Sequence, residues 1–85
     1  MSADGVVAGR GLCEASLDQV ALKSVMIAQA RETIVLANAG KLGRAEQMAW
    51  APLPRRWTLV TDATVPPDQR RHLADAGASI IVAGT

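Results

Sequence analysis

The sequence predicts an α/β fold with a small parallel sheet and flanking helices. Three short runs, residues 33–37, 57–62 and 79–83, are almost continuously apolar and rich in β-branched side chains. Such runs are typical of strands that are covered on both faces in a parallel sheet. Helix-like segments alternate with these runs, and 85 residues leave room for one small domain. We therefore expect a single domain over residues 1–85.

A helix is expected over about residues 17–31. Ser16 and Gln19 form a capping box, in which each side chain bonds to a free backbone N–H at the start of the helix. Apolar residues fall in two adjacent stripes at helical spacing, which predicts a broad buried face: Leu17, Val20, Ala21 and Ala28, with Leu22, Val25 and Met26 beside them. The preceding residues, 1–12, carry three glycines and are expected to form a loop, with a short extended start as the alternative.

Residues 57–83 are expected to form a strand–helix–strand unit. Pro67 suits the first position of its helix, and Gly77 suits the left-handed residue that ends a helix near Ala76. A connection of this kind is almost always right-handed and joins parallel strands. The segment 46–54 is ambiguous, because it fits a short helical turn followed by a short strand that prolines would stop.

The composition excludes several classes of protein. A net charge of +1 gives no dense basic face for nucleic acid, and Phe and Tyr, which could stack on bases, are absent. Cys13 and His72 are single, which excludes an internal disulfide and a multi-cysteine metal site, and no cofactor is expected. Cys13 is expected to be a small core or loop residue, and His72 a surface residue. No apolar run reaches the roughly 18 residues of a membrane span, so we expect a cytoplasmic protein.

The loop that follows the first strand, Asn38 to Gly43, is the strongest candidate for a binding site. Ligands collect at the carboxyl ends of the strands in parallel sheets. Gly40 and Gly43 would let the backbone approach an anion closely, and Lys41 between them supplies a cation. The spacing is not that of a P-loop or of a dinucleotide fingerprint. Anion binding and an ordinary glycine-rich loop with an exposed lysine therefore both stay open.

Acidic residues could complete such a site. Asp62 ends the second strand and, with residues 83–85 at the end of the third, would share an edge with the loop if the strands are parallel. The Asp62 carboxylate could accept hydrogen bonds from sugar hydroxyls, or it could cap the turn that follows. Asp4–Gly5, taken alone, is typical of a turn.

Short motifs occur in a fixed order along nearly the whole chain. They are Asp4–Gly5, Gly11–Leu12, Ala21–Leu22–Lys23, Met26–Ile27, Leu36–Ala37, Lys41, Gly43–Arg44, Ala51–Pro52–Leu53 and Thr61–Asp62. In this order the motifs resemble the C-terminal effector-sensing domain of DeoR-type bacterial transcriptional repressors. The resemblance implies a Rossmann-like fold, similar to that of ribose-5-phosphate isomerase and glucosamine-6-phosphate deaminase.

The resemblance implies a sensor without catalytic activity. In the family, the domain binds a phosphorylated sugar or a related metabolite. Binding changes the oligomer or the domain arrangement and weakens operator binding by an N-terminal winged helix. Carried over, Lys41 would meet the phosphate or a sugar oxygen, and Asp4 the sugar hydroxyls. The full set of candidate effector-binding residues is Lys41, Asp4, Gly5, Asn38, Gly40, Gly43 and Asp62.

Two departures from the family pattern concern the ligand. The aspartate at the end of the first strand is Asn38 here, and two serines before the lysine are Ala39 and Gly40. These changes remove one negative charge and two hydroxyl groups. The chain also lacks the winged helix and the first half of the sensor domain, so it resembles a fragment.

Two alternatives to a sensor stay open on the sequence. An enzyme of the sugar-phosphate isomerase kind would need a general base beside Lys41, and Asn38 in place of a carboxylate argues against it. An assembly module without a ligand is the other alternative. A partial sheet with apolar strands leaves an open edge and an uncovered face, so we expect self-association to at least a dimer. We expect no direct contact of this chain with nucleic acid or membrane.

Overall fold

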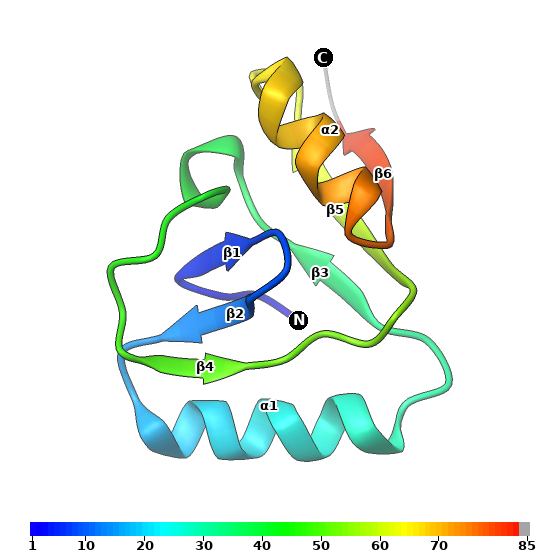
Figure 1. Cartoon of the computed structure of the whole chain (residues 1–85). Helices are drawn as coiled ribbons and strands as arrows, with labels where there is room; N and C mark the ends of the chain where they lie inside the picture. The colour runs from blue at the N-terminus through cyan, green and yellow to red at the C-terminus, as the bar shows by residue number, and fades with distance from the viewer. Residues whose placement is uncertain (84–85) are drawn as a thin grey trace.

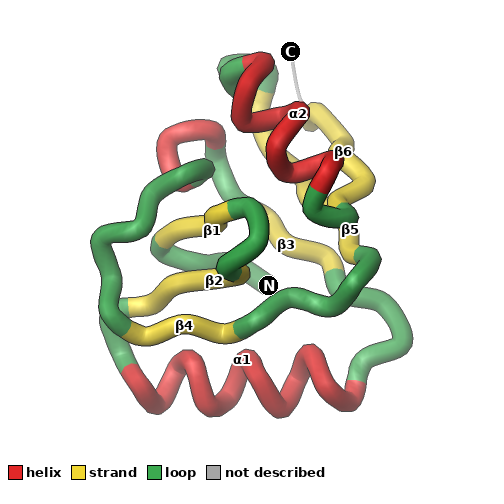
Figure 2. Tube along the Cα trace, in the orientation of Figure 1, coloured by secondary structure: helices red, strands yellow, loops and turns green. Residues whose placement is uncertain are grey.

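The structure, a computed structural model, describes residues 1–83. These residues fold into two three-stranded sheets, each packed against one α-helix (Figures 1 and 2). This confirms the α/β class. Residues 84–85, expected at the end of the third strand, lie outside the described residues. In chain order the elements are β1 (Gly5–Val7), β2 (Gly11–Glu14), α1 (Leu17–Gln29), β3 (Ile34–Leu36), the short 3-10 helix η1 (Ala39–Lys41), β4 (Ala49–Ala51), β5 (Trp57–Asp62), α2 (Pro67–Asp75) and β6 (Ala78–Ala83).

The predicted parallel sheet is present, with the strand order β3-β5-β6. Ile34 pairs with Thr58, and Thr58 pairs with Ser79, so the strands run in the same direction. α2 packs against β6 and buries Leu73 (Figure 1). Gly77 follows this helix at φ +105°, as its place in the sequence predicts.

An antiparallel sheet, β1-β2-β4, differs from the sequence prediction. The loop expected over residues 1–12 is instead a hairpin of β1 and β2, in which the Arg10 N–H donates to the Val7 carbonyl oxygen over 3.0 Å. The ambiguous segment 46–54 contributes β4, which pairs with β2, and no helical turn. These strands are too short, at three or four residues each, for their alternation to be recognised.

α1 packs against β2 and β4 of the antiparallel sheet (Figure 1). The helix begins after Ser16, whose hydroxyl accepts a hydrogen bond from the Gln19 N–H over 3.4 Å. It ends at Gln29, close to the predicted boundary. Neither α1 nor any other helix within residues 1–83 is long and apolar enough to cross a membrane.

The broad buried face predicted for α1 is wrong. The residues that face the sheet are Val20, Lys23, Ser24 and Ile27. The second predicted stripe, Leu22, Val25 and Met26, is exposed to solvent. Lys23 is buried because it forms an ion pair with Glu14 of β2 and donates a hydrogen bond to the Ser2 carbonyl oxygen. A lysine thus takes an inward position that apolar periodicity assigns to aliphatic residues.

The hydrophobic core lies between the two sheets. Val6 and Leu12 contribute to it from the antiparallel sheet, and Val35 and Leu59 contribute from the parallel sheet. Alternate residues on the parallel sheet point the other way and are not covered by any of residues 1–83. The exposed aliphatic residues on this face are Ile34, Leu36 and Ile81.

The first residues of the chain join the two sheets. The Leu36 N–H donates to the Met1 carbonyl oxygen over 2.7 Å, and Ser2 forms an isolated parallel bridge with Leu36. Val6 of β1 forms another bridge with Leu42, just after η1. The segment that follows β3 is thereby fixed against β1, and this positions the candidate site.

Candidate functional site

The loop that carries Lys41 is the ordered 3-10 turn η1. The Lys41 N–H donates to the carbonyl oxygen three residues earlier over 3.0 Å, which forms the turn. The Gly43 N–H donates to the Val6 carbonyl oxygen over 2.7 Å. The Ala39 N–H donates to the Asp62 carboxylate over 2.9 Å. Strands β1 and β5 therefore hold the turn from its two ends.

Lys41 is half-buried and lines two depressions in the described surface. The smaller depression, of about 190 Å³, is also lined by Asp4, Cys13, Arg44, Glu46 and Gln47. The wider and more open one, of about 360 Å³, brings in Asn38, Thr61 and Asp62. Within residues 1–83, the Lys41 ammonium group has no carboxylate at ion-pair distance, so its charge is free to meet an anion.

Asp4 lies in the smaller depression together with Lys41. The Ala15 N–H donates to Asp4 Oδ2 over 3.0 Å. The Asp4 N–H donates to the Cys13 carbonyl oxygen over 3.1 Å, so the backbone is fixed as well. The structure thus brings together the two residues to which the resemblance gives a ligand contact. The contact itself stays a prediction.

The three candidate glycines differ in what their surroundings require. A side chain at Gly5 would clash with the Arg44 carbonyl oxygen, so Gly5 lies beneath the smaller depression and not on its wall. A Cβ atom at Gly43, where φ is +76°, would lie 2.6 Å from Gln69 Nε2 of α2. Gly40 is exposed, and a Cβ atom there would meet only the side-chain oxygen of Asn38, at 3.3 Å. Of the three, Gly40 alone has its place on the turn without a packing requirement.

The Asp62 carboxylate accepts hydrogen bonds from two segments: the start of η1 and the turn that follows β5. Its Oδ1 atom accepts hydrogen bonds from the Thr64 hydroxyl and, over 2.9 Å, from the Thr64 N–H, while Oδ2 accepts from the Ala39 N–H. The Thr64 hydroxyl, followed by the backbone N–H groups of Ala39 and Thr64, lowers the pKa of the Asp62 carboxyl below its usual value. Asp62 therefore fixes the shared edge at which β3 and β5 end. A contact with sugar hydroxyls stays a prediction.

Arg44 and Glu46 line the smaller depression, although no role is predicted for either from the sequence. Arg44 Nε lies 3.2 Å from Glu46 Oε2, and both side chains are exposed. A second cation beside Lys41 would add to the attraction for a phosphate group. The only signal in the sequence is that Arg44 directly follows the glycine loop.

Cys13 and His72 lie where the sequence predicts. Cys13 is fully buried, and its sulfur donates a hydrogen bond to the Arg44 carbonyl oxygen over 3.2 Å. This confirms a small core residue, which supports the wall of the smaller depression. His72 is exposed on α2.

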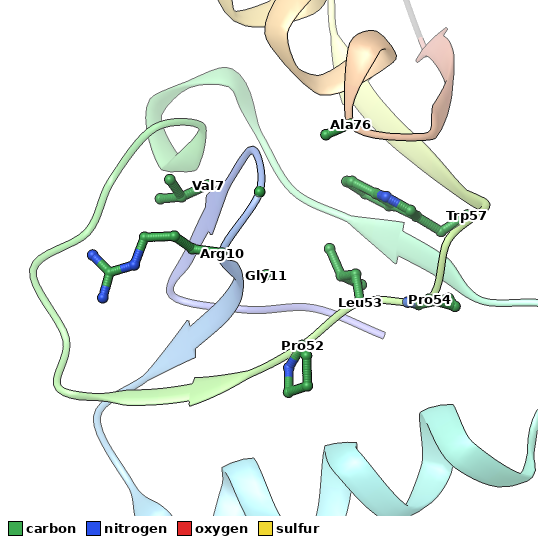
Figure 3. A pocket seen from close by; sticks show the side chains of 9 residues that line it. Val7, Arg10, Gly11, Pro52, Leu53, Pro54, Trp57 and Ala76 are labelled. Atoms are coloured by element: carbon green, nitrogen blue, oxygen red, sulfur yellow. The ribbon is translucent and has the colours of Figure 1, made fainter.

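A separate cavity of about 120 Å³ lies near the end of α2 (Figure 3). Trp57, Leu53 and Pro54 form an apolar part of its wall. Figure 3 shows that the Arg10 side chain points away from these residues, and its guanidinium carbon lies 3.9 Å from the centre of the Trp50 ring. The lining of this cavity includes no acidic side chain, and its one cation, Arg10, is directed to Trp50. The surroundings of Lys41 therefore remain the candidate site.

Comparisons with known proteins indicate the family of the chain. A family model described as the DeoR C terminal sensor domain matches residues 1–63, which include β1 to β5 and the turn with Lys41. The chain is also similar to the HTH-type transcriptional regulator GlpR of Haloferax volcanii, with 28% identity over 71 residues. That match covers 84% of this chain and 28% of the relative, so the chain spans less than a third of the relative's length. No solved structure matches the chain.

The family match covers most of the chain and decides between a regulator and an enzyme, whereas it does not test an assembly module without a ligand. A sensor domain of a transcriptional regulator is supported, and an enzyme of the isomerase kind is not. The chain belongs to the family of DeoR C-terminal sensor domains.

Proposed function

We propose that this chain is the effector-sensing part of a transcriptional regulator, and that its effector is a phosphorylated sugar or a related metabolite. The observation that carries the proposal is the position of Lys41, which has no carboxylate partner within residues 1–83 and shares a depression with Asp4. A phosphate needs positive charge and N–H donors, whereas sugar hydroxyls are recognised by carboxylate acceptors. Lys41 supplies the positive charge with its N–H donors, and Asp4 supplies the carboxylate acceptor.

In this proposal the phosphate lies toward the cations Lys41 and Arg44. The sugar hydroxyls lie toward Asp4, because a carboxylate repels a phosphate. Asn38 and Asp62 line the adjoining depression and complete the polar surroundings of Lys41. The proposed effector-binding set also includes three glycines. Gly40 lies in the turn and Gly43 follows it, while Gly5 packs against the backbone of Arg44.

The contact with DNA belongs, we propose, to another part of a longer regulator. The relative from Haloferax volcanii is described as an HTH-type regulator and is matched over only 28% of its length. This chain has a net charge of only +1, whereas DNA contacts rest on many Lys and Arg side chains. Residues 1–85 would then be one part of a Rossmann-like sensor domain, working in the cytoplasm.

Self-association is the second element of the proposal. The exposed aliphatic residues of the parallel sheet, and those of α1, form apolar surface that a small domain would normally bury. Effector binding and self-association in one chain would allow a metabolite to change the arrangement of subunits. This is the coupling that the family resemblance implies.

Titration calorimetry of the 85-residue chain with sugar phosphates tests the effector. The same sugars without phosphate, and inorganic phosphate alone, serve as comparisons. Lys41→Met should weaken the binding of a sugar phosphate at least about tenfold, since a charge-assisted contact contributes about 1.5–3 kcal/mol. Arg56→Met is the matched control, because Arg56 is an exposed cation at the opposite end of β5.

The outcomes separate the alternatives. Loss of binding in Lys41→Met and normal binding in Arg56→Met would support the site. Equal binding by Lys41→Met and the parent protein would place the effector elsewhere. No heat from any sugar phosphate would favour an assembly module without a ligand.

A further inference from the structure

The outward face of α1 is apolar and uncharged over more than one turn. Leu22, Val25 and Met26 are 54%, 60% and 45% exposed. Their spacing of three and four residues places them side by side on the helix surface. Lys23 is the only charged residue between positions 19 and 30, and its side chain points inward.

This arrangement is the reverse of an ordinary surface helix. Such a helix directs its apolar stripe to the core and its charges to water. Here Lys23 is buried against Glu14, although desolvating two charges is costly, while larger aliphatic side chains stay in water. The outward face therefore has the composition of a helix–helix contact.

A residue of each charge lies near one end of this face. Asp18 lies in the first turn of α1, and Arg31 comes two residues after Gln29, the last residue of the helix, which is about 17 Å from Asp18 at 1.5 Å per residue. The midpoint between Asp18 and Arg31 falls beside Val25, in the middle of the apolar patch. Both charged residues are exposed.

We propose that two copies of this chain pair through antiparallel α1 helices, related by a twofold axis near Val25. Asp18 of each copy then comes next to Arg31 of the partner subunit, and the apolar patches oppose each other. The positive end of each helix dipole also meets the negative end of the other. A parallel pair would instead bring Asp18 against Asp18. This proposal rests on the self-association part of the proposed function and names its surface.

The size of the patch sets the expected strength of the pairing. Two helices of 13 residues bury less than the roughly 1,200 Å² of a standard stable interface. The dimer should therefore dissociate at micromolar to millimolar protein concentrations. The bare face of the parallel sheet, with Ile34, Leu36 and Ile81, is the competing surface, so the test includes a variant on each of the two faces.

Sedimentation of the 85-residue chain over a range of concentrations tests the proposal. The mass should rise with concentration from 8.9 kDa toward twice that value. Val25→Glu places two like charges at the twofold axis and should raise the dissociation constant at least about tenfold. Glutamate is a good helix former, and circular dichroism checks that the variant folds. Ile81→Glu, on the bare sheet face, should leave the dissociation constant unchanged.

A charge exchange tests the antiparallel direction. Asp18→Arg alone should weaken the dimer, and combining it with Arg31→Asp should restore it. A monomer at every concentration would overturn both the pairing and the self-association part of the proposed function. A dimer that Ile81→Glu breaks and Val25→Glu leaves intact would overturn the pairing alone. Sugar-phosphate binding by Val25→Glu is measured in parallel, because the Lys41 site does not depend on this face.

Discussion

The ammonium group of Lys23 and the carboxylate of Glu14 form a buried ion pair, with side chains that are only 11% and 8% exposed. Lys23 also donates a hydrogen bond to the Ser2 carbonyl oxygen, so one side chain ties α1 to β2 and to the start of the chain. Removing one member of such a pair leaves the other charge buried without a partner.

Glu14→Gln should therefore lower the free energy of unfolding by about 3 kcal/mol. The double variant Glu14→Leu with Lys23→Met replaces both charges with apolar groups of similar size, and its stability should be close to that of the parent protein. Urea unfolding followed by tryptophan fluorescence measures both. A double variant that is as unstable as the single variant would contradict the argument from the unpaired charge.

Gly77→Ala should lower the free energy of unfolding by clearly more than Gly9→Ala. Both glycines have a positive φ, of +105° and +79°, which costs an alanine about 1 kcal/mol. An added Cβ atom at Gly77 also clashes with the Arg55 carbonyl oxygen, whereas nothing lies within 4 Å of one at Gly9. Thermal unfolding compares the two variants. Equal losses would show that backbone conformation alone sets the cost.

Asp62 should contribute a pH-dependent part of the stability. Its pKa is lowered in the folded state by hydrogen bonds from Thr64 and Ala39, so the folded state favours the ionised form. The stabilisation is present above the pKa of the unfolded chain and is lost as the pH falls through the lower, folded-state pKa. In Asp62→Asn, the loss of stability below about pH 4 should be smaller than in the parent protein. Urea midpoints measured from pH 7 down to pH 3 test this, and identical pH profiles would contradict it.

Cys13 should react slowly with a thiol reagent in the folded protein. Its side chain is fully buried, and its thiol donates a hydrogen bond to the Arg44 carbonyl oxygen. Modification therefore requires opening of the structure. Adding denaturant should speed the reaction by orders of magnitude. Fast labelling without denaturant would show that the wall of the smaller depression opens readily.

The parallel half of the molecule follows from the sequence because each of its signals is local. β5 and β6 are six residues long and rich in apolar and β-branched side chains, and α2 has a proline at its start and a glycine after its end. The antiparallel half could not be predicted in this way. Its strands are shorter, and β4 is paired with β2 across a long stretch of chain, which no local pattern records.

The candidate site likewise contains some residues that local sequence patterns predict and others that depend on contacts between distant segments. Lys41 and Asp62 were predicted at one edge because parallel strands end on the same side of a sheet. Asp4 follows from the family resemblance alone, since β1, which it precedes, has no pattern that local signals recognise. The sequence indicates no role for Arg44, because its position depends on how the segment after η1 crosses the hairpin. The inward direction of Lys23 could not be foreseen, because its partner Glu14 lies on an unrecognised strand.

The first six residues belong to both halves of the fold, since they form bridges with Leu36 and Leu42 and also lead into the hairpin. Neither sheet can separate from the other without breaking these bridges. The molecule should therefore melt in one cooperative transition, and fluorescence and circular dichroism should report the same midpoint.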